Sequence, residues 1–148
     1  IYESCKIKKA VVEKDEKEKG LRKILNFGHS FAHAYEATLG FSKKLNHGEA
    51  VILGMKTALN FSLKTKFMNI REYYSIIDHI DNSDLPSSVS KFFGPKDVNK
   101  ILSFMAKDKK NKSNNINLVL LKKIGAPMIN KEYSKKKIGL FLKIYLRN

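Results

Sequence analysis

The spacing of apolar residues predicts a chain made mostly of helices. In six stretches, apolar side chains recur every three or four positions, the period that gathers them on one face of an α-helix. These stretches are residues 4–14, 29–39, 47–65, 70–80, 96–106 and 133–146. Pro95 precedes the fifth stretch, at the position where a proline opens a helix. The first half of the third stretch is apolar on almost every side, so we expect it to form the buried centre of the domain.

Two shorter segments predict a single β-hairpin. Residues 116–121 and 126–129 are apolar runs on either side of Gly125, which is typical of two antiparallel strands joined by a tight turn. Strands and helices do not alternate and no glycine-rich nucleotide-binding fingerprint occurs, so we expect no nucleotide-binding sheet in this chain. The predicted fold class is mainly α: a bundle of about seven helices with one short β-hairpin.

Length and composition exclude several classes of protein. A chain of 148 residues with 43% hydrophobic side chains has the size and the apolar content of one folded domain. The single cysteine, Cys5, excludes a disulfide framework and indicates a reducing compartment, so we expect a cytoplasmic protein. No apolar run approaches the roughly 18–20 residues that a membrane span needs. The chain begins at Ile1 without a signal-peptide pattern, and we expect it to be a piece of a longer polypeptide.

The chain is strongly basic, with 29 Lys and Arg residues against 14 Asp and Glu residues and a formal net charge of +15. Such a charge favours anionic partners, among them nucleic acids, anionic membrane surfaces and phosphate-bearing small molecules. All but three of the basic residues are lysines, however, and sequence-specific readers of nucleic acid favour the planar guanidinium of arginine. A general preference for lysine at solvated positions therefore explains the charge equally well.

Three of the four histidines, His29, His33 and His47, lie within nineteen positions of one another. His29 and His33 have the i, i+4 spacing by which two imidazoles on one helical face can meet the same metal ion. His47 begins the next predicted helix, which can bring it opposite the other two. From spacing alone, a divalent-metal site with three histidine ligands is one interpretation, and ordinary core or surface histidines are the other.

Charged and amide side chains lie just upstream of these histidines. Lys8 and Arg22 can present cations to a phosphate or a carboxylate, and Asn26 supplies an oriented amide. Taken singly, Lys8 and Glu18 also fit a solvated helix face, and Lys109 fits a solvated loop. From the residues alone, the anion-binding and the solvated-surface interpretations both stand.

The longest continuous motif, Asp15–Met55, reads DEKEKGLRKILNFGHSFAHAYEATLGFSKKLNHGEAVILGM and resembles the signature of the 3-dehydroquinate synthase family. In that family a D-E-x-E-x-G-L-R segment leads into L-N-x-G-H-[ST]-x-x-H-A-x-E and then H-G-E-A-V-x-x-G-M. The flanks agree as well, with Lys8 upstream and MAKDKKN, residues 105–111, followed by the apolar NLVLL. The resemblance extends from about Lys8 to Gly125.

The resemblance implies a specific activity and a two-domain enzyme. The family converts 3-deoxy-arabino-heptulosonate 7-phosphate into 3-dehydroquinate and phosphate in the shikimate pathway, using a divalent metal and an NAD that is regenerated in each turnover. An N-terminal Rossmann-like domain binds NAD, and a C-terminal helical domain binds metal and substrate. This chain resembles only the second of these, and we expect residues 1–148 to form it as a single helical domain. We therefore expect the isolated chain to be inactive and the full-length enzyme to be a homodimer.

Carried over position by position, the resemblance assigns the site residues. His29 and His47 match the two histidine ligands of the catalytic metal, Zn²⁺ or Co²⁺, whose third ligand is a glutamate that lies earlier than any residue of this chain. His33 matches a histidine that handles protons near the substrate, which replaces the three-histidine interpretation, and Glu18 matches a proton acceptor. Contacts to the substrate's phosphate, carboxylate or hydroxyl groups are implied for Lys8, Arg22, Asn26 and Lys109.

Two alternatives remain open. The first is another sugar-phosphate cyclase, or a metal- and NAD-dependent polyol dehydrogenase of the same superfamily; the segment around Arg22 favours the synthase, because an enzyme for uncharged polyols needs no phosphate cradle. The second is a basic helical module that binds nucleic acid, which would leave the His29 and His47 pair unexplained. We expect neither nucleic acid nor a membrane as a partner. One departure from the family is Ala32, where a glycine is common, so a Cβ must be accommodated there.

Overall fold

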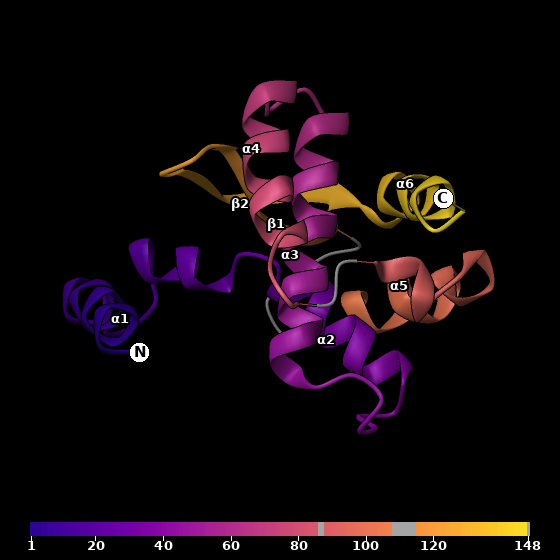
Figure 1. Ribbon diagram of the computed structural model, residues 1–148. Helices are drawn as coiled ribbons and strands as arrows, with labels where there is room; N and C mark the ends of the chain where they lie inside the picture. The colour runs from indigo at the N-terminus through magenta and orange to yellow at the C-terminus, as the bar shows by residue number, and fades with distance from the viewer. Residues whose placement is uncertain (86–87, 108–114, 148) are drawn as a thin grey trace.

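The structure is a computed structural model that describes residues 1–85, 88–107 and 115–147 (Figure 1). Its elements in chain order are α1 (Tyr2–Lys14), η1 (Leu21–Asn26), α2 (His29–Thr38), α3 (His47–Lys64), α4 (Ile70–Asp81), η2 (Val89–Lys91), η3 (Pro95–Asp97), α5 (Val98–Ala106), β1 (Asn115–Lys123), β2 (Ala126–Ser134) and α6 (Lys135–Tyr145), where η marks a 3₁₀ turn. The mainly helical class with one β-hairpin is confirmed. The described residues form six α-helices and three 3₁₀ turns instead of about seven helices.

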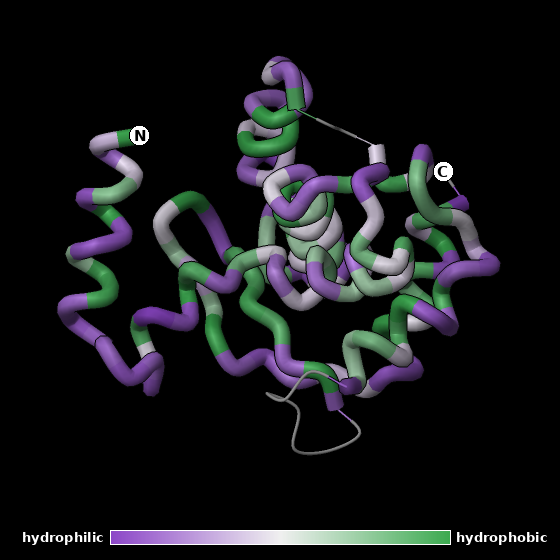
Figure 2. The backbone as a smooth tube through the Cα atoms, turned by 90° about the horizontal axis from the view of Figure 1, so that it is seen from below, coloured by the Kyte–Doolittle hydropathy of each residue, from purple (hydrophilic) through white to green (hydrophobic). Residues whose placement is uncertain are grey.

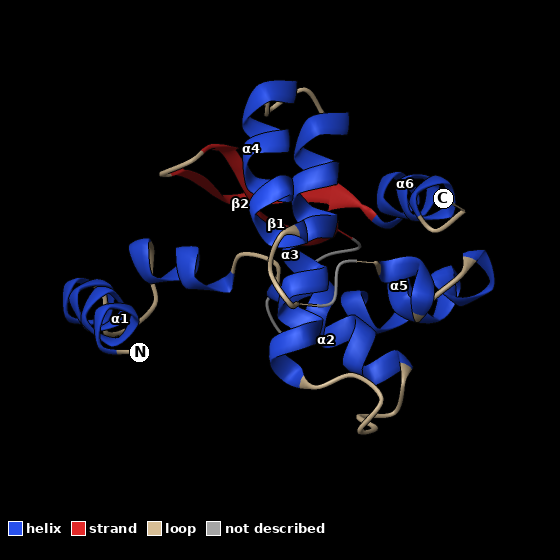
Figure 3. Ribbon diagram, viewed as in Figure 1, coloured by secondary structure: helices blue, strands red, loops and turns tan. Residues whose placement is uncertain are grey.

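The hairpin is longer than predicted, and the last helix is correspondingly shorter (Figure 3). Tyr133 and Ser134 were expected in that helix but end strand β2, where Tyr133 pairs with Ile116 across the sheet. The Tyr133 ring packs edge-to-face on Phe61 of α3 at a centroid distance of 4.8 Å. This long-range aromatic contact outweighs the local helical pattern. Helix α6 therefore begins at Lys135, and the side chain of Ser134 caps it by accepting a hydrogen bond from the backbone N–H of Lys137. Pro95 likewise opens a 3₁₀ turn rather than α5 itself.

Helix α3 is the centre of the molecule, as its apolar sequence predicts. It packs against α2 and against strand β1, while α5 joins α2 to α6 (Figure 1). These elements bury one common core of large side chains, in which the most deeply buried residues are Phe31, Tyr35, Leu53, Phe61, Ile101, Met105, Leu118, Leu120, Ile138 and Leu142. Because so many apolar side chains are buried around α3, this closely packed core holds α2, α5, α6 and β1 in place.

The start of α2 crosses α3 at backbone contact distance. A Cβ on Gly28 would lie 2.6 Å from the backbone N of Met55, and one on Gly54 would overlap the carbonyl oxygen of Gly28. Gly28 also has a φ of +81°, in the left-handed region that glycine adopts without strain. Ala32, the departure from the family, is fully buried beside this crossing, so its Cβ is accommodated. The crossing therefore requires glycine at positions 28 and 54 but tolerates alanine at 32.

Helix α1 stands apart from this core. It has no buried residue and packs chiefly against the η1 turn. Figure 2 shows it as a separate rod beside the body of the molecule. Its position therefore depends on the short segment between Lys14 and Leu21 rather than on apolar burial. No helix in the described ranges has both the length and the apolar character that crossing a lipid bilayer requires.

We expect Gly54→Ala to lower the free energy of unfolding by about 3 kcal/mol, the upper end for overpacking, because the obstacles are backbone atoms that cannot rotate away. Chemical denaturation followed by circular dichroism measures this change. The matched control is Gly48→Ala in the first turn of the same helix, where nothing lies within 4 Å of the added Cβ. Equal stability of the two variants would show that the crossing is not constrained as described.

Candidate functional site

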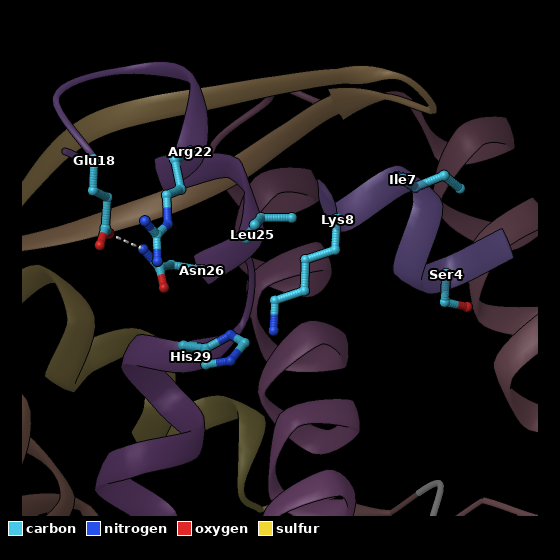
Figure 4. Close-up of a pocket in the computed structure, with 8 residues that line it drawn as sticks. All are labelled: Ser4, Ile7, Lys8, Glu18, Arg22, Leu25, Asn26 and His29. Atoms are coloured by element: carbon cyan, nitrogen blue, oxygen red, sulfur yellow. Dashed lines mark hydrogen bonds between the residues drawn. The ribbon is translucent and has the colours of Figure 1, made fainter. Parts of the chain in front are cut away.

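A cavity of about 530 Å³ lies between α1, the η1 turn and the start of α2 (Figure 4). It is lined by Ser4, Ile7, Lys8, Glu18, Arg22, Leu25, Asn26 and His29. Five of these eight residues are ones that the sequence analysis singled out, drawn from four separate segments. The cavity thus places two cations, a carboxylate, an amide and an imidazole around one space, a suitable lining for a small anionic ligand.

A second cavity, of about 460 Å³, adjoins the first and shares Glu18, Asn26 and His29 with it. Its other lining residues are Lys17, Lys23, Ser30, His33, Asn117, Leu118, Val119 and Asn130. His33, the predicted proton carrier, therefore lines one cavity together with the same Glu18 and Asn26 that face the first cavity. The predicted Lys109 lies outside the described residues.

The three histidines predicted to converge are brought together. The ring centroids are 5.6 Å apart for His29 and His33, 5.9 Å for His29 and His47, and 6.1 Å for His33 and His47. His29 and His33 lie on successive turns of α2, and His47 is the first residue of α3. The crossing of these two helices thus produces a triangle of imidazoles at the edge of the second cavity, with the His47 side chain 59% exposed.

The rings differ in what their nitrogens contact. Nδ1 of His29 lies 3.3 Å from the carbonyl oxygen of Phe27. Nδ1 of His47 lies 3.1 and 3.2 Å from the two carboxylate oxygens of Glu36. In the described part of the chain, no hydrogen bond of this kind holds the His33 ring. Histidines that bind metals usually donate their second ring N–H to a carbonyl or a carboxylate, so the two predicted ligands have the expected partners and the predicted proton carrier does not.

The donor atoms that converge in the structure belong to His33, Glu36 and His47, and this group fits a divalent metal such as Zn²⁺ or Co²⁺ but does not include the predicted ligand His29. Ring nitrogens of His33 and His47 and a carboxylate oxygen of Glu36 all lie within 4.8 Å of one another. Neutral imidazoles and carboxylates are the ligands that these metals prefer when thiolates are absent. The sequence assigned no role to Glu36, the glutamate that ends the H-[ST]-x-x-H-A-x-E segment, whereas the structure puts its carboxylate in one group of donor atoms with His33 and His47.

The segment that carries Glu18 and Arg22 is folded by Asp15. Its Oδ1 accepts a hydrogen bond from the backbone N–H of Lys19 at 2.9 Å, and its Oδ2 accepts from Gly20 at 2.8 Å and Arg22 at 3.0 Å. These three backbone donors, that of Arg22 first, lower the pKa of the Asp15 carboxyl below its ordinary value. Asp15 is therefore the residue that gives the motif its shape, a role that its position as the first letter of the motif does not reveal.

Within this turn the polar side chains are already oriented. Asn26 donates a hydrogen bond from Nδ2 to Oε1 of Glu18, as the dashed line in Figure 4 shows. Glu18 has a φ of +52°, a left-handed conformation that is costly for a residue with a Cβ. Arg22 donates from Nη1 to the carbonyl oxygen of Glu16 at 2.7 Å, which holds the guanidinium at the cavity wall. The hydrogen bonds within this turn thus orient the side chains of Glu18 and Arg22 at the cavity.

The β-hairpin contributes residues that the sequence analysis missed. Lys23 of η1 donates a hydrogen bond to Oδ1 of Asn130 at 3.1 Å, and Ser30 of α2 donates to the carbonyl oxygen of Asn117 at 3.2 Å. Asn130 has a φ of +56° at an irregularity in the strand register, where a bulge re-aims its side chain. A short alternating pattern of apolar residues predicts a strand but does not predict a bulge within it. The only indication in the sequence is the asparagine itself, because asparagine tolerates the left-handed backbone conformation.

Comparison with known proteins identifies the family. The chain matches a family model described as 3-dehydroquinate synthase C-terminal over residues 1–111. A curated 3-dehydroquinate synthase from Pelagibacter ubique (strain HTCC1062) is 59% identical over 143 residues, covering 97% of this chain and 39% of that protein. One from Endomicrobium trichonymphae is 44% identical over 126 residues, covering 84% of this chain and 33% of that protein. The chain thus spans less than two-fifths of the length of these relatives.

Solved structures share the fold. A crystal structure of 2-deoxy-scyllo-inosose synthase complexed with carbaglucose-6-phosphate, NAD⁺ and Co²⁺ matches with a TM-score of 0.75 at 24% identity, covering 94% of this chain and 38% of that chain. A second structure of 2-deoxy-scyllo-inosose synthase matches with a TM-score of 0.64 at 20% identity, covering 88% of this chain and 34% of that chain. Because the sequence identity to both structures is below 25%, their similarity to this chain shows only a shared fold.

We expect Asp15→Ala to loosen the turn that presents Glu18 and Arg22. Because the pKa of Asp15 is lowered in the folded chain, its hydrogen bonds stabilise the fold above the pKa of the unfolded carboxyl, and this contribution is lost as the pH falls through the lower folded pKa. In an NMR titration, the amide signals of Lys19, Gly20 and Arg22 should shift together at pH values below about 4.

In Asp15→Ala these amide signals should already differ at neutral pH and should no longer titrate together. The control is Asp84→Asn, which changes an exposed carboxyl in another turn and should leave all three signals in place. Concerted titration of the three amides in the alanine variant would show that Asp15 does not hold the turn.

Proposed function

The chain belongs to the 3-dehydroquinate synthase family, matching its C-terminal part, and on that basis we propose that it is the metal- and substrate-binding domain of a 3-dehydroquinate synthase. The reaction would convert 3-deoxy-arabino-heptulosonate 7-phosphate into 3-dehydroquinate and phosphate. One observation carries this proposal: Lys8, Arg22 and Asn26 face the same cavity as Glu18, beside a triangle of imidazoles. Cations for a phosphate, groups for proton transfer and donors for a metal are thus in reach of one small ligand.

We propose that His29 and His47 hold the metal, Zn²⁺ or Co²⁺. The hydrogen bonds from their Nδ1 atoms, to Phe27 and to Glu36, support this choice of ligands over His33. When bound, the metal supplies Lewis acidity that lowers the pKa of a coordinated substrate hydroxyl. The donor atoms that lie within 4.8 Å of one another are those of His33, Glu36 and His47, without His29, so His33 and Glu36 are the alternative partners of His47 for the ion.

Lys8, Arg22 and Asn26 are proposed to bind the substrate, together with Lys109. Lys8 reaches the cavity from α1 while Arg22 and Asn26 reach it from η1, so an anion between them is held from two sides (Figure 4). The charges of Lys8 and Arg22 would stabilise the phosphate as it departs as an anion, and the Asn26 amide would contribute a hydrogen bond. A polyol dehydrogenase acting on uncharged substrates would have no use for this cationic wall, which favours a phosphorylated sugar acid as the ligand.

His33 and Glu18 are proposed to move the protons. The His33 ring is exposed and lies next to His29, where a neutral imidazole can exchange protons between substrate oxygens near pH 7. Glu18 accepts a hydrogen bond from Asn26, which fixes its carboxylate at the boundary of the two cavities. Because the Glu18 carboxylate is oriented before the substrate arrives, part of the catalytic effect comes from positioning.

NAD is proposed as the hydride acceptor and donor, bound mainly by a Rossmann-like domain outside these 148 residues. The described residues form a single two-stranded antiparallel sheet and offer no parallel sheet to hold a dinucleotide. We further propose a cytoplasmic location, a homodimer for the full-length enzyme, and neither nucleic acid nor a membrane as a partner. The free, exposed Cys5 supports a reducing compartment.

The proposed reaction is tested in a chimera in which this chain replaces the corresponding part of the Pelagibacter ubique protein. With NAD, Zn²⁺ or Co²⁺ and 3-deoxy-arabino-heptulosonate 7-phosphate, the chimera should release phosphate and form 3-dehydroquinate, whereas the isolated chain should release none. Lys8→Ala and Arg22→Ala should mainly raise KM, because they remove charges that bind the substrate. A chimera that folds, binds NAD and metal, and still gives no product would contradict the proposal, as would sustained turnover by the isolated chain.

In the same chimera, metal binding and proton transfer should separate. His29→Ala and His47→Ala should reduce the metal content measured after dialysis, because each removes a ligand. His33→Ala should keep the metal but lower kcat by about 10²–10⁴-fold, the usual contribution of a positioned acid or base. The control is His79→Ala, which removes an exposed histidine of α4 and should change neither quantity. If His33→Ala also lost the metal, the three-histidine interpretation would replace the one proposed here.

A further inference from the structure

We infer that Glu36 is a positioning residue that sets which nitrogen of His47 faces the metal. This inference rests on the proposed role of His47 as a ligand. The carboxylate of Glu36 accepts the Nδ1 proton of His47 through both of its oxygens, at 3.1 and 3.2 Å. It thereby leaves the lone pair of the ring on Nε2, on the opposite edge.

The two partners are held very differently by the rest of the fold. Glu36 lies two turns along α2 with its side chain only 14% exposed, whereas the side chain of His47 is 59% exposed at the first position of α3. Packing therefore fixes the carboxylate but does little to fix the imidazole. An exposed ring takes its orientation from its hydrogen bond, and here that bond goes to a largely covered acceptor on the neighbouring helix.

The direction of this hydrogen bond follows from the chemistry of the two groups. An ionised carboxylate can only accept, so a neutral imidazole bonded to it through Nδ1 must carry its proton there. A neutral histidine side chain in water favours the other tautomer, with the proton on Nε2. The Glu36 contact thus opposes the intrinsic preference of the ring and holds the form whose Nε2 can bind a cation.

His29 provides a parallel within the same cluster. Its Nδ1 is directed at the carbonyl oxygen of Phe27, again an acceptor that cannot donate. The rings of both proposed ligands are therefore held through the same nitrogen, by a backbone group in one case and by a carboxylate in the other. Glu36 could instead bind the ion directly, since its oxygen lies within 4.8 Å of nitrogens of His33 and His47. The two roles predict different results for substitution by glutamine and by alanine.

The experiment uses the ¹⁵N-labelled, metal-free chain at a pH where the imidazoles are neutral, and long-range ¹H–¹⁵N correlation spectra report the tautomer of each ring. His47 should carry its proton on Nδ1 in the wild type and in Glu36→Gln, whose amide oxygen still accepts. In Glu36→Ala the His47 signals should change to the Nε2–H pattern. His29 should keep its Nδ1–H pattern in all three proteins, because its acceptor is backbone, and serves as the internal control.

Titration with Co²⁺ alone, followed by visible absorption, gives a second measurement. Glu36→Ala should weaken Co²⁺ binding by about 10–100-fold, and Glu36→Gln by less than about 10-fold, with the absorption bands unchanged in position. If Glu36 binds the ion directly, glutamine should weaken binding as much as alanine and shift the bands, which would overturn the inference. A wild-type His47 with its proton on Nε2 would overturn it as well.

These outcomes are separate from those that test the proposed function. The tautomer is read without metal, NAD or substrate, so an inactive chimera would leave the result for His47 standing. Circular dichroism checks that both variants are folded. Should Glu36→Ala fail to fold, the wild-type tautomer and the Co²⁺ titration of Glu36→Gln still decide between a positioning carboxylate and a ligand.

Discussion

The contact between the backbones of α2 and α3 is the constraint on which the rest of the structure depends. At Gly28 and Gly54 the two helices leave no space for a Cβ. His29 directly follows Gly28 in the chain and therefore lies at this crossing. From this crossing α2 runs back towards the start of α3, so that His33 and Glu36 arrive opposite His47. The positions of the imidazoles are therefore consequences of how closely two helices can pack, and the buried core around α3 keeps them there.

The wall that faces these histidines is stabilised by different forces. Helix α1 buries no side chain, and the turn after it is folded by hydrogen bonds to the single carboxylate of Asp15. The cations on this wall thus depend on local polar contacts, whereas the imidazoles depend on apolar packing. Local hydrogen bonds open at a lower free-energy cost than a core does, so we expect the cationic wall to be the more dynamic side of the cavity.

The large positive charge has two components in the folded chain. Most lysines lie on the solvated surface, as a general preference for lysine predicts, and the buried Lys56 is paired with Asp81 between α3 and α4. Lys8 and Arg22 differ because they converge from separate elements on one cavity with a carboxylate and an amide between them. Their arrangement in space, and not the net charge, distinguishes a site for a small anion from a generally basic surface.

The sequence by itself determined the helices, the buried centre and the identity of the candidate residues, because periodicity and motif spacing are local properties. It predicted that His29, His33 and His47 converge, since two of them share a helical face. Only the tertiary structure decided that the carboxylate of Glu36 reaches His47, that Asn130 reaches Lys23, and that Tyr133 ends a strand instead of beginning a helix. Each of these depends on contacts between segments far apart along the chain, whose geometry no local pattern encodes.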